Sequence, residues 1–458
     1  MQGLNINTVA QACNGKIYTV DSNISNKEFT GVEIDSRNIM EGNLFIATQG
    51  ERVDGHSFIP SVFEKGALAV ICEKLPEKMD GTCILVEDSF QALKDIAKYY
   101  RSILDIKVVG VTGSVGKTST KEVLASVLSE RYCVLKTAGN FNNEVGLPLT
   151  VLRIRKEHEI AVLEMGISHF GEMERLAEIA HPDVCVITNI GPCHLEFLGD
   201  LDGVLKAKTE MFQYLNPNGF ACLNGDDAKL MTIQSVNDKK PVFFGKGSNC
   251  VVTATDINNK GLLGSEALLH INGQTAHFHI HIPGEHMVQN ALCAATVGDA
   301  FGLTLEEIVS GIEKAETVKG RSRITDTGKL VVVDDCYNAN PVSMKAAISL
   351  LETAVSRKVA ILGDMFELGE NEEKLHQDVG SFLSHTNINV VICIGALAKN
   401  IYDQVADSDK QCYYFETKDA FEKELSQIIL ENDTVLIKAS NGMKFSSLVD
   451  ACLSHTWL

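Results

Sequence analysis

The sequence lacks long apolar runs, paired cysteines and an excess of basic residues. No stretch of its 458 residues approaches the roughly 18 to 20 apolar residues of a membrane-spanning helix. Its start, MQGLNINTVAQACNGK, has neither the basic residues nor the apolar run of a secretory signal. The 13 cysteines are scattered without a CxxC pair, which is typical of reduced thiols. We therefore expect a cytoplasmic protein with no membrane insertion.

The charge balance is acidic. Lysine plus arginine number 41 and aspartate plus glutamate number 60, which gives a net charge of −19. Such a surface argues against nucleic-acid and anionic-membrane partners, although a local pocket can still hold an anion. Hydrophobic residues at 45% and charged residues at 22% are ordinary for a globular chain and exclude wholesale disorder, collagen and coiled coil. At about 150 residues per domain, the length predicts about three domains.

The apolar pattern changes twice along the chain and predicts an α/β fold of three domains. Residues 1–86 mix short β-rich runs such as NLFIAT and LAVICE with turns, which indicates a mixed α/β domain. In residues 87–317, continuous apolar strands (IKVVGVT, IAVLEM, DVCVITNI) alternate with helical periods, as in a parallel sheet covered on both faces. Between Pro241 and Ile282 the alternating runs suggest an antiparallel flap on this domain. In residues 318–458 the strands KLVVVDD, KVAILG, NVVICIG and DTVLIKAS predict a Rossmann-like domain.

The strongest single motif is VVGVTGSVGKTSTKE. A buried strand ends at Thr112, a glycine-rich loop follows, and Lys117-Thr118 opens a helix. Backbone N–H groups and the helix start can hold phosphate, Lys117 can reach a terminal phosphate, and the Thr118 hydroxyl can ligate Mg²⁺. The spacing departs from a strict Walker A motif, because the first glycine falls on Val111, so a plain strand-to-helix turn is the alternative. The predicted nucleotide-binding residues here are Gly113, Ser114, Val115, Gly116, Lys117, Thr118 and Ser119.

Two further polar residues follow predicted strands of the same sheet. Glu164 comes after IAVL, and His194 lies in the loop beyond DVCVITNI. Ligands gather at the carboxyl ends of parallel strands, and a carboxylate and an imidazole are reasonable metal ligands there. The sequence therefore predicts a metal site formed by Thr118, Glu164 and His194. The simpler readings are a helix or turn carboxylate for Glu164 and an ordinary loop histidine for His194.

Ordered motifs along the chain resemble the Mur ligase family. They are TGSVGKTSTKE, TAGNFNNEVGLP, VLEMGISHFGE, HLEFLG, AKTEMF, PGEHMVQNALCA, DDCYNANP and GDMFELG, with EIDSRNIMEGNLFIATQGERVDGHSFI near the start. The resemblance implies a UDP-substrate domain, a central ATPase domain and a C-terminal acceptor domain. It implies an ATP-dependent ligase that forms an amide through an acyl phosphate. The implied small-molecule substrates are UDP-MurNAc-tripeptide and D-Ala-D-Ala, and the implied cofactors are ATP and two Mg²⁺ ions. We also expect a monomer.

The resemblance assigns roles to residues in all three domains. Asn140 would line the catalytic pocket, and Lys208 is the lysine that related ligases carbamylate with CO₂, with Lys206 the weaker candidate. A second Mg²⁺ would lie near His194. ATP contacts are implied for Asn290, Arg321, Asp335, Tyr337 and Asn338, with Asn340 in the same closing loop. In the first domain, UDP-substrate contacts are implied for Ser36, Arg37, Asp54 and His56.

The last strand departs from the family pattern. After DTVLI the chain reads Lys438, Ala439, Ser440, Asn441, where the family usually has an arginine in place of the asparagine. An arginine could hold a dipeptide carboxylate in two parallel hydrogen bonds, whereas asparagine offers a weaker contact. Either the carboxylate is held elsewhere, by Lys438 or by a helix N-terminus, or the affinity for the dipeptide is reduced. An arginine that only packs between domains is the other reading of the family pattern.

Other functions stay open at this point. A tripeptide synthetase adding a diamino acid, or a folylpolyglutamate synthase, would share the central chemistry. The third domain has no DNPR-like motif of the diamino acid ligases, and the DSR and DGHSF segments argue against folate. A P-loop phosphotransferase would not explain a Rossmann-like third domain, and the intact Lys117, Thr118, Glu164 and His194 argue against an inactive scaffold.

Overall fold

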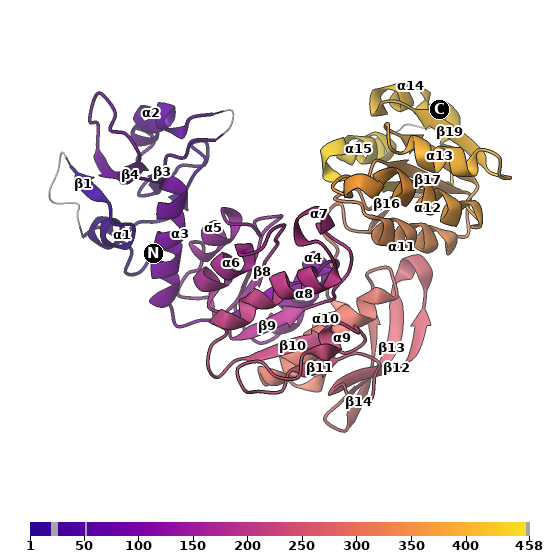
Figure 1. Ribbon diagram of the computed structural model, residues 1–458, viewed down its shortest axis with the longest axis horizontal. Helices are drawn as coiled ribbons and strands as arrows, with labels where there is room; N and C mark the ends of the chain where they lie inside the picture. The colour runs from indigo at the N-terminus through magenta and orange to yellow at the C-terminus, as the bar shows by residue number, and fades with distance from the viewer. Residues whose placement is uncertain (20–25, 51–52, 455–458) are drawn as a thin grey trace.

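The structure is a computed structural model that describes residues 1–19, 26–50 and 53–454. It contains three α/β domains, each built on its own sheet (Figure 1). Glu51 and Arg52 of the N-terminal motif lie outside the described residues. Polar side chains accept hydrogen bonds from backbone N–H groups at the starts of several helices, which satisfies groups that the helix itself leaves unpaired. These caps are Asn5, Asp88, Asp200, Thr304, Asn340 and Thr417.

The first domain has a five-stranded sheet in the order β1-β5-β4-β3-β2. Only the β1–β5 pair is antiparallel. The middle strands are fully buried because Leu44–Ile46 and Ala69–Cys72 are apolar on both faces. The elements are α1 (Ile6–Ala12), β1 (Lys16–Tyr18), β2 (Val32–Glu33), β3 (Leu44–Ile46), α2 (Ile59–Glu64), β4 (Ala69–Cys72) and β5 (Thr82–Leu85).

Helix α3 (Ser89–Ser102) connects this domain to the next. Its apolar side chains Leu93, Ile96 and Tyr100 are buried on one side of the helix, in the core cluster that joins the first domain to one face of the central sheet. The Tyr100 hydroxyl donates to the Ile154 carbonyl oxygen at 2.8 Å. The apolar side of the amphipathic helix predicted from SFQALKDIAKYYRSIL therefore packs against both the first and the central domain.

The central domain has a nine-stranded sheet in the order β14-β13-β12-β11-β10-β9-β6-β8-β7. The strands from β7 to β12 pair in parallel, and β12, β13 and β14 pair antiparallel. The predicted antiparallel flap is therefore an extension of the main sheet, because β12 pairs with β11. The strands are β6 (Lys107–Thr112), β7 (Val134–Lys136), β8 (Ile160–Glu164), β9 (Val184–Ile187), β10 (Phe220–Asn224), β11 (Val242–Phe244), β12 (Val252–Asn259), β13 (Ser265–Ile271) and β14 (Gln274–Ile280).

Alternate residues of the parallel strands feed two separate cores. Val109 and Val111 of β6 pack with α4, α9 and α10, whereas Val108 faces the core that includes α5, α6 and α8. A sheet covered on both faces leaves its strand ends as the place for polar chemistry. The helices are α4 (Lys117–Leu128), α5 (Gly146–Val151), α6 (Glu172–Ala180), α7 (Leu195–Leu198), α8 (Leu201–Thr209), α9 (His286–Ala300) and α10 (Leu305–Glu313).

The third domain has a six-stranded sheet in the order β15-β16-β20-β17-β18-β19. All pairs except β15–β16 are parallel. Two strands, β15 and β19, are additional to those predicted from the sequence. The elements are β15 (Arg323–Asp326), β16 (Val331–Asp334), α11 (Pro341–Glu352), β17 (Lys358–Gly363), α12 (Glu372–Ser384), β18 (Val390–Ile394), α13 (Lys399–Val405), β19 (Gln411–Phe415), α14 (Lys418–Ile428), β20 (Thr434–Lys438) and α15 (Ser446–Ser454).

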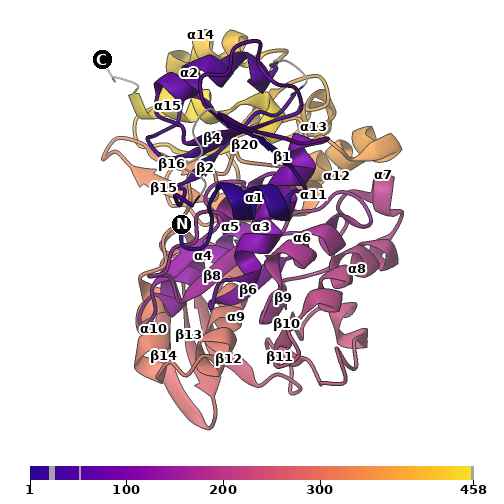
Figure 2. The same ribbon diagram turned by 90° about the vertical axis from the view of Figure 1, so that its left-hand side faces the viewer.

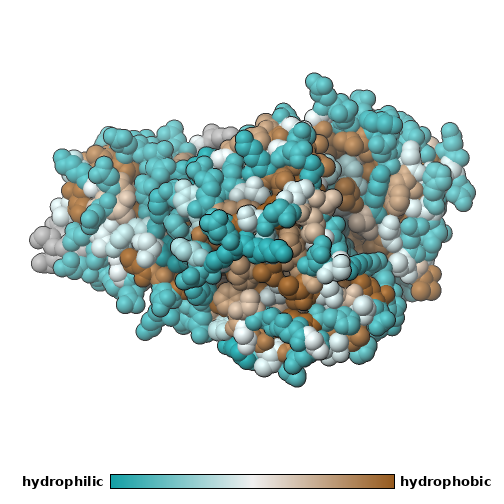
Figure 3. Space-filling model, turned by 60° about the horizontal axis from the view of Figure 1, so that its bottom comes forward, coloured by the Kyte–Doolittle hydropathy of each residue, from teal (hydrophilic) through white to brown (hydrophobic). Residues whose placement is uncertain are grey.

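The first and third domains stand on the same side of the central domain. Figure 1 shows them at opposite ends of that side, and Figure 2 shows one in front of the other above the central sheet. The face seen in Figure 3 is mostly hydrophilic, and its hydrophobic residues gather toward the hollowed middle and right. Among the described residues, no helix has the length and apolar character needed to cross a membrane.

Candidate active site

The glycine-rich loop joins β6 to α4 at the carboxyl edge of the central sheet. Gly116 has a φ of 82°, in the left-handed region that favours glycine, and it precedes the first residue of α4. A Cβ at Gly113 would lie 2.0 Å from Thr188 Oγ1, so only glycine fits there. The N–H groups of Ser114 and Val115 donate to Asn189, which holds the loop in place. The first backbone N–H groups of α4 have no acceptor within the helix and can bind a phosphate.

Lys117 curls back over this loop. Its ammonium donates to the Gly113 carbonyl oxygen at 2.8 Å. Burial lowers the pKa of Lys117, and Arg321 adds to the effect, while Glu164 opposes it. A lysine held at a helix start by one weak acceptor is available for an anion. Ser119, at the start of α4, lines a small cavity of about 10 Å³ together with Thr118 and Arg321.

Glu164 ends β8 beside the phosphate loop. Its Oε1 accepts from Thr118 Oγ1 at 3.2 Å and from Asn142 Nδ2 at 2.8 Å. Its Oε2 is buried and accepts no hydrogen bond, and its cationic neighbour is Lys121 at 3.8 Å. Asn142 was missed by the sequence analysis, which chose Asn140 from the same GNFNNEVG loop.

The Thr118 and Glu164 oxygens fit a hard divalent cation, because a buried carboxylate oxygen without a donor is a suitable ligand. Among the described residues, no three His, Cys, Asp or Glu side chains form a metal site by themselves. A metal held by Thr118 and Glu164 would complete its coordination with oxygens of water or of the substrates.

His194 follows β9 and lies in the left-handed region with a φ of 50°. Burial, together with Lys117 and Lys208, lowers the pKa of His194 to about 4. A neutral imidazole suits a ligand role. In this structure its Nδ1 is 3.6 Å from Glu367 Oε2 of the third domain, a neighbour that the sequence analysis did not identify.

Lys208 is the buried lysine of α8, with 1% of its surface exposed. Burial and the nearby Lys117 lower the pKa of Lys208 to about 7. Within the described residues its ammonium makes no hydrogen bond or ion pair. By contrast, Lys206 is more exposed and lies over the Phe170 ring at 5.7 Å. These surroundings favour Lys208 over Lys206 as the candidate for carbamylation.

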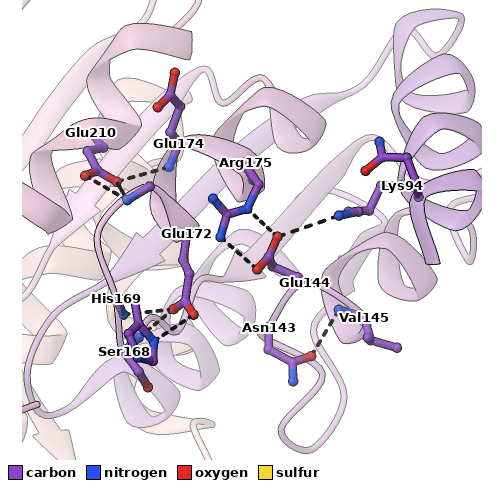
Figure 4. Close-up of polar contacts among 12 residues, drawn as sticks. Lys94, Asn143, Glu144, Val145, Ser168, His169, Glu172, Glu174, Arg175 and Glu210 are labelled. Carbon is purple, nitrogen blue, oxygen red and sulfur yellow. Dashed lines mark hydrogen bonds and ion pairs between the residues drawn. The ribbon is translucent and has the colours of Figure 1, made fainter. Parts of the chain in front are cut away.

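The loops around Glu164 and Lys208 are held by a network of carboxylates (Figure 4). Glu144, two residues after Asn142, lies between Arg175 of α6 and Lys94 of α3, with Nε–Oε1 at 2.5 Å and Nζ–Oε1 at 3.9 Å. Glu210, two residues after Lys208, accepts with both oxygens from the Gly171 N–H at 3.1 and 3.0 Å. This network fixes the Asn142 loop and the end of α8 to α6.

The hinge and third domain reach the loop through Arg321. Its guanidinium lies 4.0 Å from the Tyr337 ring centroid, and its Nη2 is 3.5 Å from Thr118 Oγ1. Burial raises the pKa of Tyr337, against opposing contributions from Arg321 and from Asn140. Asn290 packs beside Gly116 and accepts from Thr120 Oγ1 at 3.0 Å. The structure therefore brings Arg321, Tyr337 and Asn290 together beside the phosphate loop, and their contacts with ATP stay a prediction.

Lys438 differs from its predicted role. The side chain is 2% exposed and donates to Asp335 Oδ2 at 2.5 Å, to the Asn338 carbonyl at 3.0 Å and to the Asp335 carbonyl at 3.4 Å. All three of its donors are engaged, which argues against an additional contact with a dipeptide carboxylate. The acceptor-binding role of Lys438 stays a prediction, and in this structure the lysine fixes the loop that carries Asp335, Tyr337 and Asn338. Asn340 caps α11.

In the first domain, the predicted substrate residues have different surroundings. Arg37 is exposed and pairs with Asp35 at 2.6 Å, and its hydrogen bonds lower the pKa of Asp35 to about 2. The Ser36 carbonyl accepts from Lys65 at 2.7 Å. His56 is buried, with Nδ1 2.7 Å from Asp54 Oδ1 and Nε2 accepting from the Glu73 N–H. These contacts support a structural role for Asp54 and His56 and leave Arg37 accessible.

The fold and the site together define a P-loop nucleotide-binding protein whose third domain reaches the phosphate loop. The chain belongs to the Mur ligase family. It matches the "Mur ligase family, catalytic domain" over residues 28–101, the "Mur ligase middle domain" over 111–298 and the "Mur ligase, glutamate ligase domain" over 320–441.

Relatives and solved structures match nearly the whole chain. The UDP-N-acetylmuramoyl-tripeptide–D-alanyl-D-alanine ligase of Bacillus subtilis is 39% identical, with 92% of each chain covered. A crystal structure of MurF from Acinetobacter baumannii has a TM-score of 0.89 at 32% identity and 99% coverage of both chains. MurF from Thermotoga maritima, solved with ADP, has a TM-score of 0.80 at 30% identity, covering 92% of this chain and 97% of its own. The similarity therefore includes all three domains.

Proposed function

We propose that this chain is an ATP-dependent ligase that joins D-Ala-D-Ala to UDP-MurNAc-tripeptide, giving the pentapeptide precursor of peptidoglycan, ADP and phosphate. The observation that carries the proposal is the match over nearly the whole chain to ligases named for this reaction. The Glu164, Lys117 and Arg321 geometry supports it, because it presents positive charge and a carboxylate where a triphosphate would lie. A phosphotransferase would share the loop but not the three-domain match.

The reaction needs charge neutralisation and alignment. The tripeptide carboxylate attacks the γ-phosphate of ATP and forms an acyl phosphate, and the dipeptide amine then displaces phosphate. Lys117 and the start of α4 would bind the phosphates, and Arg321 would approach from the hinge side. A magnesium ion, when bound by Thr118 and Glu164, would neutralise phosphate charge. The third domain would exclude water that otherwise hydrolyses the acyl phosphate.

We also propose that Lys208 is carbamylated. Carbamylation joins the neutral amine to CO₂ with loss of a proton and replaces a buried cation with an anion. The pKa of about 7 supports a useful neutral fraction of the Lys208 amine. Mass spectrometry of the intact protein in bicarbonate, with Lys206→Ala retaining the added mass and Lys208→Ala losing it, would test the assignment. The second metal near His194, the monomeric state and a cytoplasmic location remain predictions.

One assay tests the main proposal. ATP-dependent phosphate release is measured with UDP-MurNAc-tripeptide and, in turn, D-Ala-D-Ala, a diamino acid or glutamate as acceptor. We expect turnover with D-Ala-D-Ala and a product of pentapeptide mass. Turnover with another acceptor and none with the dipeptide would overturn the proposal. Tripeptides ending in lysine or diaminopimelate, compared side by side, would identify the third residue.

A further inference from the structure

One of the contacts between the central and third domains joins two residues with left-handed backbones. His194 has a φ of 50°, and Glu367, in the GDMFELG loop after β17, has a φ of 62°. The imidazole Nδ1 and Glu367 Oε2 are 3.6 Å apart, which is too long for a good hydrogen bond. The Glu367 side chain is 70% exposed. A carboxylate of the third domain therefore faces the central site without being used by it.

Glu367 has no cationic partner of its own. Across residues 1–19, 26–50 and 53–454, no lysine or arginine nitrogen lies within 4.0 Å of its carboxylate, and no donor hydrogen-bonds to it. Glu164, in contrast, is held by Thr118 and Asn142. ATP and the UDP-linked substrate are anionic, so a carboxylate at this point does not attract them. It is complementary to a cation.

The Glu367 loop is fixed to the segment that follows β20. The Phe366 N–H donates to Ser440 Oγ at 2.9 Å, and the Ser440 N–H donates to the Asp364 carbonyl at 3.0 Å. A Cβ at Gly442 would lie 3.1 Å from the Phe366 ring, so that ring packs on the chain beside Asn441. Phe366 is also 41% exposed. One edge of the third domain therefore presents a carboxylate, an apolar ring and an uncharged polar segment side by side.

Resting on the proposed function, we infer that Glu367 binds the α-ammonium group of the acceptor dipeptide. D-Ala-D-Ala carries a cation at one end, two methyl groups and a carboxylate at the other. Glu367 holds its amine end toward His194, Phe366 supplies apolar surface to a methyl group, and the carboxylate end points toward Ser440–Gly442. Glu367 therefore sets the orientation in which the dipeptide amine meets the central domain.

The first test is a charge-removing substitution with a matched control. Glu367→Gln is compared with Glu370→Gln, an exposed glutamate three residues away without a contact partner in the described structure. With ATP and UDP-MurNAc-tripeptide saturating, we expect Glu367→Gln to raise the KM for D-Ala-D-Ala about tenfold or more, equivalent to about 1.4 kcal/mol or more. The KM values for ATP and UDP-MurNAc-tripeptide, and the Mg²⁺ concentration for half-maximal rate, should stay unchanged. Glu370→Gln should behave like wild type.

A second acceptor separates ammonium binding from acyl-phosphate formation. Hydroxylamine is largely uncharged at mildly alkaline pH and has no ammonium group for Glu367 to bind. We expect Glu367→Gln to form the hydroxamate as fast as wild type while its dipeptide KM is raised. Equal losses with both acceptors, a raised Mg²⁺ requirement or an unchanged dipeptide KM would each overturn the inference. A wild-type enzyme that makes no product from D-Ala-D-Ala would instead refute the proposed function.

Discussion

Thr118 and Glu164, 46 positions apart in the chain, share a hydrogen bond at the head of the phosphate loop. The Thr118 hydroxyl lies 3.2 Å from Glu164 Oε1 because β6 and β8 pair in parallel with Val111 opposite Glu164. The second oxygen of Glu164 is buried and accepts no hydrogen bond. The pairing of two strands thus creates an open ligand position that neither strand has alone.

Glu164→Gln should impair metal use. The amide keeps the shape but removes the charge that a divalent cation needs, so kcat should fall by at least about tenfold, which is about 1.4 kcal/mol. The Mg²⁺ concentration for half-maximal rate should rise. Initial rates across a Mg²⁺ titration measure both, with the exposed Glu157→Gln as control. Wild-type Mg²⁺ dependence in Glu164→Gln would contradict the metal assignment.

Lys117→Ala should remove ligation while the fold stays intact. The ammonium makes one hydrogen bond, to the Gly113 carbonyl, so its loss should change stability little. A charged donor lost from the phosphates should lower kcat by at least about 100- to 1000-fold. Phosphate-release assays and thermal melts measure these effects, and Lys107→Ala at the other end of β6 is the control. Full activity in the folded variant would exclude the phosphate-loop role.

Lys438→Met should destabilise the third domain. It would leave the Asp335 carboxylate buried without its cation, and breaking a buried pair in this way costs about 3 to 5 kcal/mol. Urea unfolding followed by circular dichroism would measure the loss, whereas the exposed Lys423→Met should change stability by less than about 0.5 kcal/mol. A fully stable Lys438→Met variant with a raised dipeptide KM would restore the acceptor role that the structure argues against.

Lys208 should make stability depend on pH. Burial and Lys117 lower its pKa from 10.5 to about 7, so between these values the unfolded chain binds a proton that the folded chain does not. The free energy of unfolding contributed by this group therefore rises with pH across that window, and the burial penalty is fully present below it. Denaturant titrations at several pH values, with bicarbonate excluded, should show a steeper rise for wild type than for Lys208→Met. Parallel curves would contradict the lowered pKa.

Arg37→Ala should weaken binding of the UDP-substrate. The Arg37–Asp35 pair is exposed and solvent-screened, so its loss should change stability little, while a lost diphosphate contact should raise the substrate KM about tenfold. Lys78→Ala removes a similar surface pair, with Asp80, in the same domain and should leave the KM unchanged. Equal KM values in the two variants would show that Arg37 does not contact the substrate.

The sequence alone determined the parallel strands and the phosphate loop. IKVVGVT and IAVLEM are continuous apolar runs, which have a stable place only in a sheet covered on both faces. Glycines at 113 and 116, followed by Lys117-Thr118, form a motif within six consecutive residues that can be recognised in the sequence, although Thr188 and Asn189 hold the folded loop in place. These features are encoded within a few neighbouring residues, and the Mur ligase resemblance follows from the same kind of local motif.

Tertiary structure alone decided which polar groups meet. The antiparallel strands belong to the main sheet because β12 pairs with β11. The Lys438 ammonium donates to the carboxylate of Asp335, which is 103 positions away in the chain. Asn142 rather than Asn140 reaches Glu164, and Glu367 is placed opposite His194 by the packing of two domains. The type of a residue determines which hydrogen bonds and ion pairs its side chain can form. Only long-range packing sets whether those bonds are already satisfied, and that determines whether a lysine or a glutamate is left for a substrate.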